Sequence, residues 1–226
     1  SMSSSNANEI DAVSRSALIS SRSCHDLVNP IGALSSGLEV LNDPSMDSSM
    51  HEAALDLIKS SAEKSVALLK YARLAYGASG GLGAELPLEE ARNVLQALLA
   101  WSKAKLDWRI APDQAPKDEV KALLVLGAAA ADCVPRGGEI VMEGARGAYE
   151  IRVTGQRVIM QDEMVKALAG EAGELKPKFT PHYLSGVAAR AVGGEIAVTH
   201  EEGAAAFSLR FSAGSAQFAP SPLTAG

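Results

Sequence analysis

The chain has few aromatic residues and few cysteines. Phe, Trp and Tyr make up 4% of its 226 residues, which weakly disfavours a large apolar ligand pocket, since such pockets usually recruit aromatic side chains. The two cysteines, Cys24 and Cys133, are too few for a disulfide framework or a zinc site. We therefore expect a reduced, cytoplasmic protein with a core built mainly of Ala, Leu and Val.

Basic residues and long apolar runs are also scarce. The 21 Lys and Arg are outnumbered by 27 Asp and Glu, and the net charge of −6 argues against nucleic acid as the main partner. No apolar run approaches the roughly 18 residues that a membrane span needs. The N-terminal residues lack the basic and apolar layout of a signal peptide. We expect neither a nucleic acid nor a membrane partner.

The first third of the chain has the apolar period of a helical bundle. Apolar and small residues recur at alternating steps of three and four from residue 10 to residue 41, which predicts a long helix that ends at Asn42-Asp43-Pro44. A second such seam runs from Ala54 to Ala75. The loop at roughly residues 42–50 is short, so the two helices should form an antiparallel hairpin. Because two helices bury little apolar surface, we expect a homodimer that completes a four-helix bundle.

The rest of the chain alternates between helical and strand patterns after a glycine-rich linker at residues 77–83. Helices are predicted at 88–101, 117–131, 161–169 and 181–191, and strands at 105–110, 137–144, 148–155, 194–200 and 205–211. This order predicts an antiparallel-rich sheet with helices on one face. We thus divide the chain into a helical hairpin (1–78), an α/β domain (84–213) and a loose tail (214–226).

His25 is the candidate nucleophile. Cys24 lies on the first seam, so His25 lies about 100° away from it, at the flank of the bundle, where an imidazole tip is exposed. Asp26 can hold the ring tautomer or handle the proton. Asn29, four residues on, shares the face of His25, and Pro30 should kink the helix. The alternative is a lone histidine on a helix bent for packing, and the combined pattern favours the functional reading.

The residues around His25 resemble a motif of a known protein family. HDLVNP (residues 25–30) resembles the H-box of two-component histidine kinases, which lies on the first helix of a dimeric bundle. Residues 133–142 and 183–211 resemble the ATPase domain of those kinases, and the whole resemblance covers about residues 10–211. It implies a dimeric helical hairpin followed by a degenerate histidine-kinase ATPase-like α/β sandwich.

Three parts of a nucleotide site are missing from that resemblance. The place of the Mg²⁺-binding asparagine falls near Ala129, which has no donor atom for a hard cation. Residues 155–162 lack the second glycine of the adenine-reading Asp-x-Gly-x-Gly loop. Where the lid should carry a phosphate cradle, Ser185-Gly186 keeps one glycine. The fold is therefore expected to have lost ATP and to have no cofactor of its own.

A histidine without ATP must receive its phosphoryl group from another protein. The architecture is similar to the ChpT family of alphaproteobacterial histidine phosphotransferases. That resemblance implies a phosphorelay in which the receiver domain of a CckA-like hybrid kinase donates the phosphoryl group and CtrA-like and CpdR-like regulators accept it. The receiver would supply the aspartate and Mg²⁺. The α/β domain would offer a second docking surface.

Other roles stay open at this point. Arg22 shares the face of His25, and it either contacts the receiver or the transferring phosphoryl oxygens, or is a solvated arginine. No role is assigned to His51, His182 or His200, which lack metal-ligand spacing. The alternative functions are an active sensor histidine kinase and a non-catalytic scaffold or inhibitor of a kinase.

Overall fold

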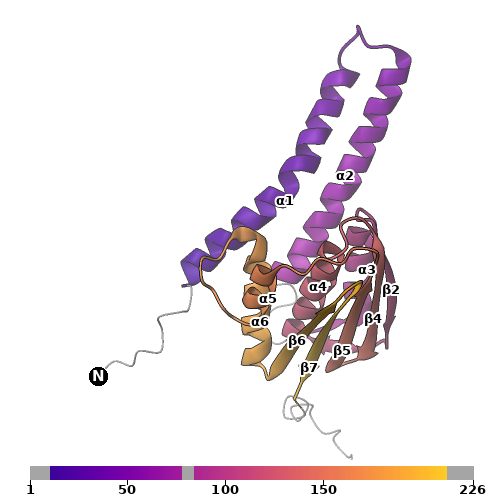
Figure 1. The fold of residues 1–226 in the computed structure, drawn as a ribbon. Helices are drawn as coiled ribbons and strands as arrows, with labels where there is room; N and C mark the ends of the chain where they lie inside the picture. The colour runs from indigo at the N-terminus through magenta and orange to yellow at the C-terminus, as the bar shows by residue number, and fades with distance from the viewer. Residues whose placement is uncertain (1–10, 78–83, 213–226) are drawn as a thin grey trace, which may run out of the picture.

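The N-terminal part of the protein is an antiparallel helical hairpin. The computed structural model describes residues 11–77 and 84–212. Helix α1 (Ala12–Leu41) and helix α2 (Ser48–Tyr76) pack against each other, and Figure 1 shows them projecting from the rest of the molecule and diverging toward the N-terminal end of α1. Each helix begins at an aspartate, Asp11 or Asp47, whose side chain accepts a hydrogen bond from a first-turn backbone N–H. The predicted hairpin is thus confirmed, with a shorter loop than expected.

The face that α1 turns to α2 contains residues outside the heptad seam. The two fully buried residues of α1 are Pro30 and Gly37, and Gly37 lies against Ala54 and Ile58 of α2. By contrast, Ile31 and Leu38 of the seam are exposed, which the seam alone did not indicate. α1 continues as a helix through Pro30, which lacks the N–H that would bond the carbonyl of Asp26.

The second part is an α/β unit. Its elements are β1 (Glu85–Pro87), α3 (Leu88–Leu99), β2 (Ala104–Ile110), β3 (Gln114–Pro116), α4 (Lys117–Asp132), β4 (Gly138–Ala145), β5 (Ala148–Thr154), α5 (Asp162–Leu168), η1 (Pro177–Phe179), α6 (Thr180–Ala191), β6 (Gly194–Glu201) and β7 (Ala204–Phe211). The five-stranded sheet has the order β2-β4-β5-β7-β6. Strands β2 and β4 pair in parallel and the other neighbours pair antiparallel. Helices α3, α4 and α6 pack on one face of the sheet (Figure 1).

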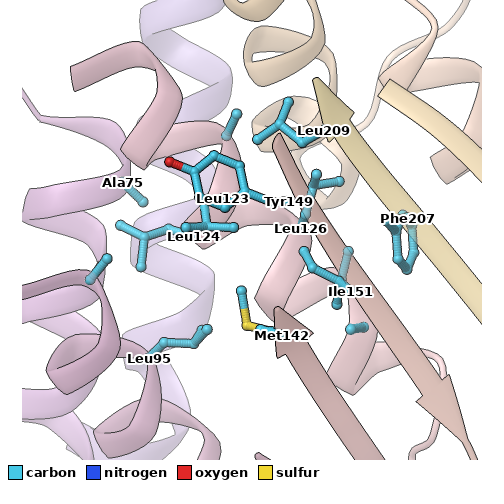
Figure 2. Packing of buried hydrophobic residues seen from close by; sticks show 14 of the residues in the cluster. Ala75, Leu95, Leu123, Leu124, Leu126, Met142, Tyr149, Ile151, Phe207 and Leu209 are labelled. Atoms are coloured by element: carbon cyan, nitrogen blue, oxygen red, sulfur yellow. The ribbon is translucent and has the colours of Figure 1, made fainter. Parts of the chain in front are cut away.

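Helix α4 forms the centre of the core. Its residues Leu123, Leu124 and Leu126 are fully buried among side chains from β4, β5 and β7, from α3 and from the end of α2 (Figure 2). Gly127 allows a close approach, because a Cβ there would lie 2.4 Å from a Leu95 methyl carbon. Burying each large apolar side chain stabilises the fold by roughly 1.5–3 kcal/mol. This gain explains why α4 is almost wholly apolar after its first turn.

A buried carboxylate fixes the β4–β5 turn to α4. Glu119 accepts hydrogen bonds from the Tyr149 hydroxyl at 2.6 Å and from the backbone N–H of Gly147. Gly147 has φ of +87°, a conformation that glycine adopts without strain. Burial, and to a lesser extent the hydrogen bond to Glu119, raises the pKa of Tyr149 far above its usual value. The phenol therefore keeps its proton and remains a hydrogen-bond donor.

Most predicted elements are present with small shifts at their ends. The three-residue strands β1 and β3 and the short helix η1 were not predicted. The hairpin lies inside the predicted range 1–78 and the α/β unit inside 84–213, while the loose tail (214–226) and all but Gly77 of the linker fall outside the described residues. The boundaries between the domains remain predictions. None of the described helices has the length and hydropathy needed to cross a membrane.

Candidate phosphoacceptor site

His25 lies in the middle of α1 with its side chain 85% exposed. The exposure follows from its position on the helix, which turns Pro30 and Gly37 to α2 and leaves His25 on an outer flank. A ring in this position is accessible to a large partner without any movement of the fold. The sequence prediction of an exposed imidazole tip is confirmed.

Asp26 divides its two oxygens between two neighbours. Its Oδ2 accepts a hydrogen bond of 3.0 Å from Arg22 Nε, and its Oδ1 lies 3.9 Å from His25 Nδ1. The second distance is too long for a hydrogen bond, so the carboxylate lies beside Nδ1 without bonding to it. A carboxylate beside Nδ1 favours a proton on that nitrogen and leaves Nε2 with a free electron pair.

Arg22 is turned into the protein and away from the open surface. Its side chain is 21% exposed, and its Nη1 donates a hydrogen bond to the backbone carbonyl of Lys178 in η1. Burial lowers the pKa of Arg22, but interactions with Tyr76 and Asp26 outweigh burial and leave the pKa raised. Arg22 is therefore a permanent cation that bridges α1 and the α/β unit.

Two further titratable groups, Tyr76 and Asp132, interact with this arginine. Burial raises the pKa of Tyr76 to about 12, so its phenol stays neutral. Burial also raises the pKa of Asp132, and the positive charges of Arg22 and Lys178 partly oppose the rise. The Asp132 side chain is open to solvent but lies in a hollow with protein on most sides, which accounts for the raised pKa despite this exposure.

His182 belongs to the same cluster and was not identified from the sequence. Its side chain is buried, at 4% exposure, and its Nδ1 has no hydrogen-bond partner in the described part of the chain. Burial is the main cause and the charge of Arg22 the second cause of a pKa lowered to about 3 for His182, so the ring is neutral. The only sequence signal was Pro181, which marks a helix start and places His182 in the first turn of α6.

Asn29 is exposed one turn after His25, as its spacing indicates. The remaining histidines lie elsewhere. His51 Nε2 is 3.0 Å from the carbonyl oxygen of Asp43, and His200 Nε2 is 3.3 Å from the carbonyl oxygen of Val158. Over residues 11–77 and 84–212, no group of three or more His, Cys, Asp or Glu side chains could hold a metal ion.

Three of the positions compared with a nucleotide site lie inside packed helices. Ala129 is fully buried in α4. Ser185 and Gly186 lie inside α6, where Gly186 allows the carbonyl of Leu168 to approach, because a Cβ there would lie 2.2 Å from that oxygen. They are therefore part of a packed helix, which agrees with the helix predicted at 181–191, and not of a phosphate-binding loop.

A cavity of about 490 Å³ lies at the end of α4. Its lining includes Asp132, Lys178 and Phe179, and Trp101, one of the more exposed large apolar side chains, lies among them. Because Lys178 also accepts the hydrogen bond from Arg22, the cavity adjoins the cluster beside His25.

Known proteins share both parts of this architecture. The family model described as "Histidine phosphotransferase C-terminal domain" matches residues 88–222. The "Protein phosphotransferase ChpT" of Brucella abortus (strain 2308) is 34% identical over 169 residues, which are 73% of this chain and 79% of that protein. A solved structure described as a bacterial phosphotransferase superimposes with a TM-score of 0.80 at 29% identity, over 89% of this chain and 98% of that one.

Proposed function

Because the chain belongs to the histidine phosphotransferase family, we propose that it relays a phosphoryl group between the aspartates of two receiver domains through His25. The observation that carries this proposal is the 85% exposed imidazole of His25 with a carboxylate 3.9 Å from its Nδ1. An exposed, oriented histidine suits a reaction in which the other reactant is itself a protein.

In the transfer step, His25 Nε2 attacks the phosphorus of a receiver phosphoaspartate. The N–P bond forms as the P–O bond to the aspartate breaks, and that electron pair returns to the receiver carboxylate. The ring gains positive charge, which Asp26 stabilises at Nδ1–H or relieves by accepting the proton. Asn29, on the same face, can bond the phosphoryl oxygens or the receiver. The reverse step passes the group to the second receiver.

The chain needs no nucleotide for this step, and the receiver supplies Mg²⁺. The fully buried Ala129 supports independence from ATP, because the side chain at that position cannot bind a metal ion. Catalysis then rests mainly on positioning the two reacting groups and on the receiver's metal. This chemistry distinguishes the proposal from an active sensor kinase.

We propose that the protein is cytoplasmic and forms a homodimer. Both helices of the hairpin expose large apolar side chains. On α1, Val13, Ile31 and Leu38 share one face, since residues 13 and 31 are about five turns apart and residues 31 and 38 about two. The exposed set is Val13, Val28, Ile31, Leu38, Met50, Leu55, Leu57, Val66 and Leu69. Apolar surface of this extent on a hairpin is typical of a helix–helix interface, and a second hairpin would complete a four-helix bundle.

The expected partners are the receiver of a CckA-like hybrid kinase as donor and CtrA-like and CpdR-like regulators as acceptors. The similarity to a ChpT protein supports this choice. A receiver docked over His25 would also reach the α/β unit. The cavity near Trp101, which shares Lys178 with the cluster, supports a second docking surface there.

The test is phosphotransfer from a labelled receiver. The receiver of a CckA-like kinase, phosphorylated on its aspartate, should label the wild-type chain in an acid-labile form and should not label His25→Gln. Labelling by ATP alone, lost in His25→Gln, would indicate a sensor kinase. A chain that accepts no label from any receiver, with His25→Gln still active in the pathway, would indicate a scaffold.

A further inference from the structure

Arg22 connects the phosphoacceptor helix to a distant segment of the chain. Its Nε bonds Asp26 Oδ2 at 3.0 Å, and its Nη1 bonds the carbonyl of Lys178, 156 residues away. A guanidinium is planar and rigid, so the two bonds are not independent. The position of the Asp26 carboxylate is thus tied to the position of η1.

The segment that holds the Lys178 carbonyl is itself fixed. Phe179 is buried, and its ring centroid lies 5.8 Å from that of His182 on α6. The Thr180 hydroxyl donates a hydrogen bond of 2.9 Å to the carbonyl of Lys176. This bond spans η1 and joins the residues on either side of it. The carbonyl that meets Arg22 therefore moves with the α/β unit as a body.

This geometry gives Arg22 a role different from the two considered from the sequence. With 21% exposure, and with Nε and Nη1 both hydrogen-bonded within the protein, its guanidinium is held between Asp26 and η1. What it can do is hold Asp26. The other oxygen of Asp26 is the one beside His25 Nδ1.

We infer that Arg22 is a positioning residue that transmits the placement of η1 to Asp26 and so orients the carboxylate beside His25 Nδ1. The inference rests on the proposed phosphotransfer at His25. It gives the α/β unit a part in the reaction: a receiver that shifts the α/β unit relative to α1 would alter the orientation of Asp26, and with it the tautomer of the nucleophile.

The first experiment uses Arg22→Gln in the full chain. Transfer from a phosphorylated CckA-type receiver should slow by about tenfold or more, since a misplaced group commonly costs that much. The affinity for the receiver should be unchanged. The ¹⁵N shifts of His25, one of four histidines and assignable with His25→Gln, should move from the Nδ1–H tautomer toward Nε2–H. A purely structural role would not produce that shift.

Arg92→Gln is the matched control. Arg92 pairs with Glu89 at 3.6 Å on α3, so the variant loses an arginine from an ion pair that lies elsewhere. It should keep the wild-type rate and the wild-type His25 shifts. If Arg22→Gln also kept both, the inference would be overturned.

A double-mutant cycle tests the connection to η1. Pro177→Gly loosens η1 and should slow transfer in the wild-type background, but should have no further effect in Arg22→Gln. Additive effects of Pro177→Gly and Arg22→Gln would contradict the inference. A wild-type chain that accepts no phosphoryl group would instead contradict the proposed function.

Discussion

Gly37 of α1 packs directly against Ile58 of α2. A Cβ at position 37 would lie 2.8 Å from Ile58 Cγ1 and 3.2 Å from the backbone oxygen of Ala54. These distances are shorter than ordinary contacts, so the two helices approach as closely as they do because residue 37 has no side chain. The hairpin that presents His25 depends on this close approach.

Gly37→Ala should therefore destabilise the fold. Overpacking of this kind typically costs about 1–3 kcal/mol, measurable as a lower urea midpoint. Gly32→Ala is the matched control, because a Cβ at Gly32 meets nothing within 4 Å. The control should raise stability by up to about 1 kcal/mol through helix propensity. A change of the same sign for both variants would contradict this account of the hairpin.

Charges on the exposed apolar face of α1, formed by Val13, Ile31 and Leu38, should separate the protomers. Ile31→Glu and Leu38→Glu place carboxylates on that face, where a dimer would have to bury them. Light scattering at micromolar concentration should give about twice the monomer mass for the wild type and the monomer mass for these variants. Val192→Glu, at a comparably exposed apolar residue just after α6, should remain dimeric. A monomeric wild type would undo the dimer proposal.

Loss of the Glu119 charge should weaken the α/β unit. Gln keeps one acceptor oxygen but brings two amide hydrogens that need partners in a buried place. We expect Glu119→Gln to cost about 1–3 kcal/mol in the free energy of unfolding. Glu163→Gln, in an exposed pair 3.4 Å from Lys176, should change it by less than about 0.5 kcal/mol. Equal effects would show that the Glu119–Tyr149 contact contributes little.

Stability should decrease in mild acid because of His182. Its pKa is about 3 in the folded protein against 6.5 as the reference. Between these values the unfolded chain binds a proton that the folded chain does not, so the free energy of unfolding falls as pH decreases. The slope from this group is at most about 1.4 kcal/mol per pH unit. His182→Gln should show a shallower slope between pH 6 and pH 4 in urea titrations, and an unchanged slope would contradict the burial argument.

The sequence predicts the elements that have a clear period, and misses those that depend on distant contacts. The hairpin and the larger strands follow from the spacing of apolar residues. Strands β1 and β3 have three residues each, too few for any period to appear. The Lys178 carbonyl that Arg22 contacts is 156 residues away in the sequence, so no local pattern could indicate that contact.

The heptad seam of α1 shows how far a sequence period can predict the packing of a single helix. It places Ile31 and Leu38 on the same face as Leu27 and Leu34, and a period alone does not say which side of that face meets α2. The structure turns Pro30 and Gly37 to α2, because small or compact residues allow the closest helix approach. Of the candidate site, the exposure of His25 was predictable, whereas the burial of Arg22 was not.

The buried position of Ala129 has a consequence for how the protein can change. An asparagine there would place a larger, polar side chain at a fully buried position, at a cost of about 1–3 kcal/mol if its amide finds no hydrogen-bond partner. Reinstating the metal ligand by one substitution would thus destabilise the fold before it restored any site. If the chain relays phosphoryl groups without ATP, as proposed, the packing of α4 opposes a return to nucleotide binding through a single substitution at this position.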